Sequence, residues 1–370
     1  MGIETRIMES PEAAEIYITA VPCCNKEAKK QAEELFSGIA EILSEKNARI
    51  FQERLFATRE TMDEVCATRR SIYGNLDNTV APCRLAVPSG RNGPVTGVQV
   101  HAVSTSKPAE ILRLGGTPCG RLIRAGKGVY ATLSGISAPQ AGDKAAQACS
   151  MFEKAESVLN QTGTDTHSVA RTWLWLADIL DWYDGLNSIR NQFFRQRGLV
   201  HKNGSCKLPA STGIGISPFG GASCVMDLIA VIEPADSIYY HLVGGHQGSA
   251  YDYGSAFSRA SRAPSPAGQT VFVSGTASID AKGATLHRGD APAQITATIE
   301  NVRAILKDMN CCDQDVVQSI IYCKTAEVEN LFCDKWSQLP WPRITAIADI
   351  CREDLLFEIE ATAVIPAVKL

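Results

Sequence analysis

The stretch DAPAQITATIENVRAIL, residues 290–306, decides the fold. Apolar residues follow Gln294 at offsets of 1, 5, 8 and 12 residues, which places them on one face of a helix. The same offsets follow Gln147 in GDKAAQACSMFEKAESVL (142–159) and Gln31 near the N-terminus. Because any amphipathic helix can give such offsets, the three helices indicate a repeat only together with the segments around them.

Apolar segments with strand character flank each of these helices. One precedes each helix, at 15–21, 129–137 and 271–279, and one follows it, at 49–57, 168–177 and 315–323. A third segment ends in Ala-Val, 21, 22 and 22 residues after Pro82, Pro209 and Pro342. The pattern predicts an α+β fold of three β–α–β–(α)–β units, at residues 1–105, 106–235 and 236–370, with an irregular linker at 236–257.

The helices of such a unit cover one face of its sheet and leave the other face to be buried elsewhere. We therefore expect the three units to pack these faces against each other around a pseudo-threefold axis. That arrangement places clefts between units, where small ligands usually bind.

Composition excludes several classes of protein. The chain has 370 residues, 45% apolar and 21% charged, which is typical of two or three folded domains. A net charge of −4 without a basic run argues against nucleic-acid or membrane partners. Neither the N-terminus nor any apolar run resembles a signal peptide or a membrane span. We expect a cytoplasmic protein whose 13 cysteines are mostly core thiols.

Metal-ligand spacings are missing from the sequence. It contains no CxxC, HxxxH or HExxH pattern among its 13 cysteines and six histidines. The prediction is a protein without metal or organic cofactor.

A pair of charged residues distinguishes the third unit from the other two. Arg343 follows the proline of that unit, and Glu358 begins its last strand fifteen residues later, with Glu360 on the same strand face. The residues at the offsets of the pair are Ala210 and Val225 in the second unit, and Cys83 and Val98 in the first.

This pair suggests the chemistry of a cleft. An arginine forms bidentate hydrogen bonds with a carboxylate substrate, and a buried glutamate can act as a general acid. Because a nearby arginine lowers a glutamate pKa, the acid role requires the substrate carboxylate to neutralise Arg343. The alternative is an exposed strand face that carries two glutamates.

Several of these motifs resemble the reactive-intermediate deaminase (RidA, or YjgF-type) superfamily. They are VFVSGTASI, the helix with its glutamine, PRIT and EIEATAVI, together with the spacing from Arg343 to Glu358. The resemblance implies a trimeric arrangement with ligand clefts between units. For a chain with three fused units, it implies a pseudo-trimer, expected to be monomeric.

The resemblance is closer to the chorismatase branch, which splits chorismate into pyruvate and a cyclic product. RTW (171–173), QFFRQR (192–197), LPASTGIG (208–215), FSRA (257–260), VSGTASI (273–279) and DICREDLLFEIEA (349–361) carry it. It implies that Glu358 protonates the enolpyruvyl methylene and that arginines hold the two carboxylates. The substrate-binding residues that it implies are Arg343, Arg259, Arg197, Tyr239, Ser274, Gly275 and Thr276.

The product is left open. Cys351 resembles the cysteine of the hydroxybenzoate-forming subtype. Ala260, in contrast, resembles the residue found in the subtype that forms a dihydroxycyclohexadiene carboxylate. Two other functions also remain open: a RidA-type imine or enamine deaminase, and a non-catalytic protein that binds small carboxylates.

Overall fold

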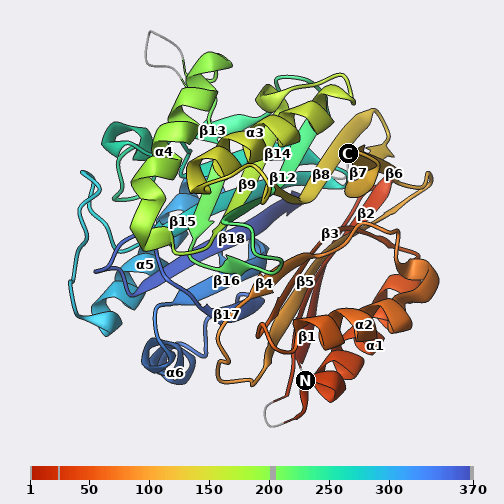
Figure 1. Ribbon diagram of the computed structural model, residues 1–370, viewed down its shortest axis with the longest axis horizontal. Coiled ribbons are helices and arrows are strands. Elements are labelled where there is room, and N and C mark those ends of the chain that lie inside the picture. The colour runs from red at the N-terminus through yellow and green to blue at the C-terminus, as the bar shows by residue number, and fades with distance from the viewer. Residues whose placement is uncertain (1, 24–25, 201–205, 367–370) are drawn as a thin grey trace.

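The computed structural model describes residues 2–23, 26–200 and 206–366. Within these ranges the chain forms three six-stranded sheets and six α-helices. Figure 1 shows the helices on the outside of the molecule and the sheets turned towards its middle. The predicted α+β fold of three fused units is confirmed.

The first sheet is built by the N-terminal part of the chain and one short strand from further on. Its strand order is β1-β2-β5-β3-β4-β11, with α1 (Ala28–Glu45) and α2 (Met62–Tyr73) on one face. The strands are β1 (Gly2–Glu9), β2 (Ala13–Val21), β3 (Arg49–Ala57), β4 (Cys83–Ala86), β5 (Val95–Thr105) and β11 (Ser217–Pro218).

The second sheet repeats five of these strands in the same order, with a sixth strand, β6, at the edge opposite to that of β11. Its order is β10-β9-β12-β8-β7-β6, with α3 (Lys144–Asn160) and α4 (Ile179–Gln196) outside it. The strands are β6 (Glu110–Leu114), β7 (Thr117–Ala125), β8 (Gly128–Ser137), β9 (Val169–Leu176), β10 (Ala210–Ile214) and β12 (Cys224–Glu233).

The third sheet has the order β13-β14-β15-β18-β16-β17, with α5 (Ala291–Asp308) and α6 (Ala326–Lys335) outside it. Its strands are β13 (Tyr239–His241), β14 (Ala260–Ser265), β15 (Gly268–Ala277), β16 (Val316–Cys323), β17 (Arg343–Ile347) and β18 (Phe357–Pro366). The linker predicted as irregular at 236–257 thus contributes an edge strand, β13.

The two faces of each sheet enter different cores. Apolar residues on the outer faces pack against the helices of their own unit in three separate clusters. Residues on the inner faces form one central core that includes Phe56, Trp175 and Ile344, one from each sheet. The expected packing of bare sheet faces around a common axis is therefore formed.

The glutamine that marks each repeat has the same structural role every time. Gln294 is fully buried, and its amide accepts from the Leu356 backbone N–H and donates to the carbonyls of His287 and Asp354. Gln31 and Gln147 hold the corresponding loops through the N–H groups of Val95 and Ser223. Each glutamine satisfies backbone groups that lead into the last strand of its unit, since buried backbone groups without partners are costly.

None of the α-helices in the described ranges is both long and apolar enough to cross a membrane.

Candidate functional site

Three clefts lie at the junctions between units, each beside the edge strand of one unit and strands of the next. Strand β10 meets β15 and β18 at one junction, β4 meets β8 and β12 at another, and β17 meets β2 and β5 at the third. The first of these contains Glu358, and we call it the Glu358 pocket.

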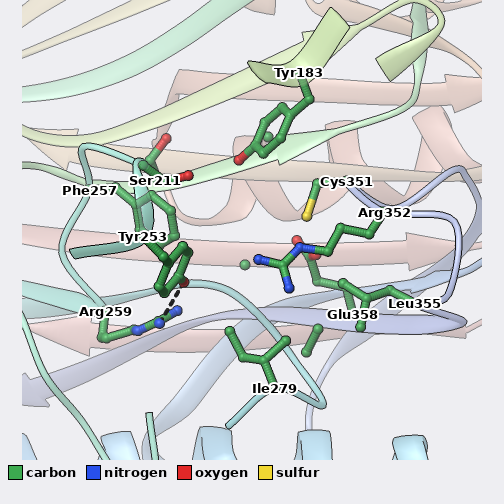
Figure 2. Close-up of a pocket in the computed structure, with 14 residues that line it drawn as sticks. Tyr183, Ser211, Tyr253, Phe257, Arg259, Ile279, Cys351, Arg352, Leu355 and Glu358 are labelled. Atoms are coloured by element: carbon green, nitrogen blue, oxygen red, sulfur yellow. Dashed lines mark hydrogen bonds between the residues drawn. The ribbon is translucent and has the colours of Figure 1, made fainter. Parts of the chain in front are cut away.

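The Glu358 pocket joins the second and third units. Its lining combines the outer face of β10, the Gly275 turn of β15, residues 253–259 and the loop 351–355 (Figure 2). The lining residues are Tyr183, Ser211, Gly213, Tyr253, Ser255, Phe257, Arg259, Gly275, Ala277, Ile279, Cys351, Arg352, Leu355 and Glu358. Its free volume is ≈ 40 Å³, far less than in the other two clefts.

Glu358 occupies its position because Gly275 has no side chain. A Cβ atom built on Gly275 would lie 2.1 Å from Oε1 of Glu358. The carboxyl group is 5% exposed, and no hydrogen bond to a described residue holds it. The glutamate therefore faces the pocket with its proton available to a ligand.

Burial raises the pKa of Glu358 to about 8. The neighbouring carboxylate of Glu360 contributes to this rise, while Arg171, Arg352 and Arg259 oppose it by smaller amounts. The free protein at neutral pH therefore carries mostly the protonated acid.

Glu360 is fixed from the adjacent unit. Its carboxylate accepts from Nη2 of Arg171 at 3.0 Å and from Nε1 of Trp173 at 2.6 Å, and all three side chains are buried. Both glutamates lie on the inner face of β18, so the alternative of an exposed edge face is wrong.

Two guanidinium groups face the pocket. Arg259 is buried and donates to the Gly248 carbonyl and to the Tyr253 hydroxyl, at 2.6 Å for the latter. The side chain of Arg352 extends across the pocket and donates to the carbonyl of Gly283 (Figure 2). Neither arginine pairs with a carboxylate among the residues that the structure describes, so both can take an anion.

Cys351 and Tyr183 complete one wall of the pocket. Burial and the nearby Glu358 raise the pKa of the Cys351 thiol to about 12, and burial also raises the pKa of Tyr183. Both groups are neutral at physiological pH and can donate hydrogen bonds.

Arg343 lies elsewhere, and the expectation that it shares a cleft with Glu358 is wrong. It lines the cleft between the third and first units, and its guanidinium donates to the carbonyls of Leu339 and Ser337. The physical reason is the strand order: β17 is the edge of the third sheet and faces the first unit, whereas β18 faces the second. Each cleft thus combines the edge strand of one unit with the last strand of the next unit. In the third unit that last strand, β18, carries Glu358.

Two further expected contacts are not formed. Arg197 ends α4 and is held by Glu156 at 2.6 Å and 2.7 Å, so its charge is already paired outside the pocket. Tyr239 is half exposed on β13 and lies near Arg262. Neither side chain lines the Glu358 pocket.

The remaining expected residues lie at or beside the pocket. Gly275 lines it, whereas Ser274 and Thr276 are buried behind it. Ser274 accepts from the Ser211 N–H and donates to a carbonyl of its own unit, and this joins the two units. Ala260 is buried in the helix-side core of the third unit, away from the lining.

Strand register identifies the counterparts of Glu358 in the other units. Val225 pairs with Ser137 of β8, and Glu358 pairs with Ala277 of β15, so the two residues have the same register position in their units. Val98 belongs to a helix-side core, so the inward-facing residue next to it is Gly97 rather than Val98. Neither position carries an ionisable group.

The sequence interpretation missed Arg352, Tyr183 and Ser211. Arg352 stands in the quoted segment 349–361, next to Cys351, so its position was a usable signal. Ser211 likewise stands in the quoted segment 208–215, whereas Tyr183 carries no local signal, because its role depends on how the second unit meets the third.

Comparisons with known proteins find similar sequences and a similar fold. Residues 250–365 match the family model described as Endoribonuclease L-PSP. A RutC family protein of Pyrococcus abyssi (strain GE5 / Orsay) is 28% identical over 100 residues, which cover 26% of this chain and 79% of that protein. A 3-hydroxybenzoate synthase of Streptomyces hygroscopicus is 29% identical over 222 residues, which cover 52% of this chain and 62% of the synthase.

A crystal structure of a chorismatase shares the fold, with a TM-score of 0.54 and 21% identity over 76% of this chain and 86% of that one. The matched region spans less than two thirds of the length of the synthase. The fold consists of three fused units of one kind, and the third unit matches the Endoribonuclease L-PSP family model. The matches together support a chorismatase-like branch of the RidA superfamily.

Proposed function

We propose that the chain cleaves the enolpyruvyl ether of a cyclic carboxylate such as chorismate, with Glu358 as the proton donor. The supporting observation is a buried carboxyl group with a pKa raised to about 8, beside two arginines that have no acidic partner among the described residues. A general acid is most effective when its pKa lies near the working pH.

In this reaction Glu358 transfers its proton to the terminal methylene carbon of the enolpyruvyl group. Positive charge develops on the ether carbon, and the carboxylate left on Glu358 stabilises it. Water then adds to that carbon, and the adduct collapses to pyruvate and a ring alcohol. In the hydroxybenzoate-forming alternative an intramolecular rearrangement replaces the attack of water, with Cys351 as a neutral thiol beside the reacting ring.

Arg259 and Arg352 are the proposed carboxylate holders. Arg259 is already oriented by Gly248 and Tyr253, whereas Arg352 fills part of the pocket. A ring-sized substrate needs more than ≈ 40 Å³, so its binding requires Arg352 to leave the carbonyl of Gly283. A substrate carboxylate compensates for that lost hydrogen bond with a charge-assisted one.

The small free volume also favours a second candidate, hydrolysis of a small enamine or imine such as 2-aminoacrylate or its imine tautomer. In that case Arg259 holds the carboxylate and Glu358 positions water.

The deciding experiment incubates the protein with chorismate, follows pyruvate release and identifies the cyclic product. Release of pyruvate with one cyclic product supports ether cleavage. Turnover of 2-aminoacrylate without turnover of chorismate supports the imine hydrolase. Failure of both substrates contradicts both proposals.

A further inference from the structure

The cleft between the first and second units is a cavity of ≈ 450 Å³ that the proposed reaction does not use. Its walls are β4 with β11 on one side, and β7, β8 and β12 on the other. By strand order this first-second cleft corresponds to the Glu358 pocket, one unit earlier in the chain. It is large enough for a small organic ligand.

The first-second cleft has a binding surface but no acid. Val225 stands where Glu358 stands, so this cleft has no carboxyl group to donate a proton there. Apolar groups dominate the rest of its wall, among them Pro118, Ile136 and Phe219. Such a surface suits the ring of an aromatic ligand.

A buried hydroxyl in this cleft lacks a partner. Ser134 is 6% exposed, and its Oγ forms no hydrogen bond with a described residue. The counterpart in the third unit, Ser274, lies behind the Glu358 pocket and has two such bonds. Because an unpaired buried hydroxyl costs free energy, a ligand group that bonds to Ser134 is favoured.

Among the residues that the structure describes, one cationic side chain lines the same cleft. The guanidinium of Arg84 lies 5.2 Å from the ring centroid of Phe219, and both residues line the cavity. No ion pair with a carboxylate holds Arg84 in the ranges that the structure describes. The Glu358 pocket, in contrast, contains two guanidinium groups.

We propose that the first-second cleft is a non-catalytic binding site for a small aromatic monocarboxylate. Arg84 pairs with the carboxylate, the ring packs between Phe219 and Val225, and a ring hydroxyl bonds to Ser134. One cation selects a monoanion, as the two arginines of the Glu358 pocket suit a dianion.

Benzoate and 3-hydroxybenzoate are suitable probes, titrated by calorimetry into an Arg259→Gln variant. This background removes one of the two carboxylate holders of the Glu358 pocket and so weakens benzoate binding there, and the Arg84 variants then assign the remaining binding. Adding Arg84→Gln is expected to weaken benzoate binding about 10- to 100-fold, as the loss of a charge-assisted hydrogen bond does. Ser134→Ala is expected to remove any preference for 3-hydroxybenzoate over benzoate.

Arg343→Gln is the matched control, because Arg343 lines the corresponding cleft between the third and first units. It is expected to leave benzoate binding unchanged. Ala222→Leu fills part of the cavity from another wall and leaves the guanidinium of Arg84 unchanged. It should also abolish benzoate binding. This second variant keeps the test valid even if the Arg84 variant does not fold. The proposal is overturned if Arg259→Gln alone binds no benzoate, or if Arg84→Gln and Ala222→Leu both bind it normally. All these readouts are binding constants, so they are independent of whether chorismate is turned over.

Discussion

The absence of one side chain, at Gly275, creates the space in which the Glu358 carboxyl group lies. Because Oε1 is 2.1 Å from the place of a Cβ atom, even alanine at position 275 would displace the acid. The acid is also kept uncharged by burial and by Glu360 rather than by a hydrogen bond of its own. Position and protonation of this residue thus have separate structural causes.

Glu358→Gln is expected to reduce the turnover of chorismate by about 10²–10⁴-fold, because the amide keeps the shape but cannot supply the proton. The Michaelis constant should change little, since Arg259 and Arg352 still hold the carboxylates. Pyruvate release measured under saturating substrate gives the comparison. Arg343→Gln, in another cleft, should behave as wild type, and a Glu358→Gln enzyme with near-normal turnover would exclude the mechanism.

The pH dependence of kcat/KM for the free enzyme should follow the raised pKa of Glu358. The protonated form is the donor, so activity is expected to be high below pH 8 and to fall about tenfold per unit above it. A pH–rate profile from pH 5 to 10 measures this limb. A limb that rises with pH through this range would mean that Glu358 acts as a base instead.

Stability depends on the same pKa and should also decrease as pH rises. Because folding raises the pKa of Glu358 from 4.5 to about 8, its stabilising protonation is complete below about pH 4.5 and is lost as pH rises to about 8. Glu358→Gln removes this loss of stability. At pH 9 the variant is expected to have a higher Tm and a free energy of unfolding that is larger by at most roughly 5 kcal/mol. Thermal scans at pH 5 and 9 test this, and equal effects at both pH values would contradict it.

At the scale of elements, the loop 351–355 depends on α5. Gln294 fixes the backbone of Asp354 and Leu356, on either side of Leu355, which lines the pocket. Gln294→Leu is expected to destabilise the fold by roughly 2–4 kcal/mol, because several buried backbone groups lose their partners. It should also lower kcat by displacing Arg352 and Cys351.

Gln31→Leu is the matched control for this prediction. Gln31 makes the same contacts in the first unit, far from the Glu358 pocket, so its variant should lose similar stability but keep kcat. Measurements at a temperature where both variants are folded separate the two effects. Equal kcat losses in both variants would assign Gln294 a merely structural role.

These elements also show what the sequence could predict. Helices and strands follow from periodicity, because each helix has one buried face and each strand alternates between a helix-side and a central core. The pairing of Arg343 with Glu358 failed because both belong to one unit, and periodicity within a unit does not reveal which neighbour an edge strand meets. Tyr183, on α4, joins the site only through the packing of units.

At the scale of the whole molecule, buried ion pairs join the units around the central core. Arg171 and Trp173 of the second unit hold Glu360 of the third. Asp227 has the corresponding place in the second unit, where it is 3.4 Å from Nε of Arg54 in the first unit and accepts from Trp175. Breaking a buried pair is costly because it leaves a charge without its partner.

Glu360 lies close enough to the proposed proton donor Glu358 to raise its pKa, whereas Asp227 lies at the junction of the first and second units. Glu360→Gln and Asp227→Asn should each destabilise the chain by about 3–5 kcal/mol, the usual range for a broken buried pair. Only Glu360→Gln removes the carboxylate that raises the pKa of Glu358, so the alkaline limb of kcat/KM should move to lower pH in that variant alone. If both variants keep the limb of the wild type, burial by itself sets the protonation of Glu358, and the pairing across units serves stability only. If Asp227→Asn also moves the limb, the units are coupled more widely than these local contacts explain.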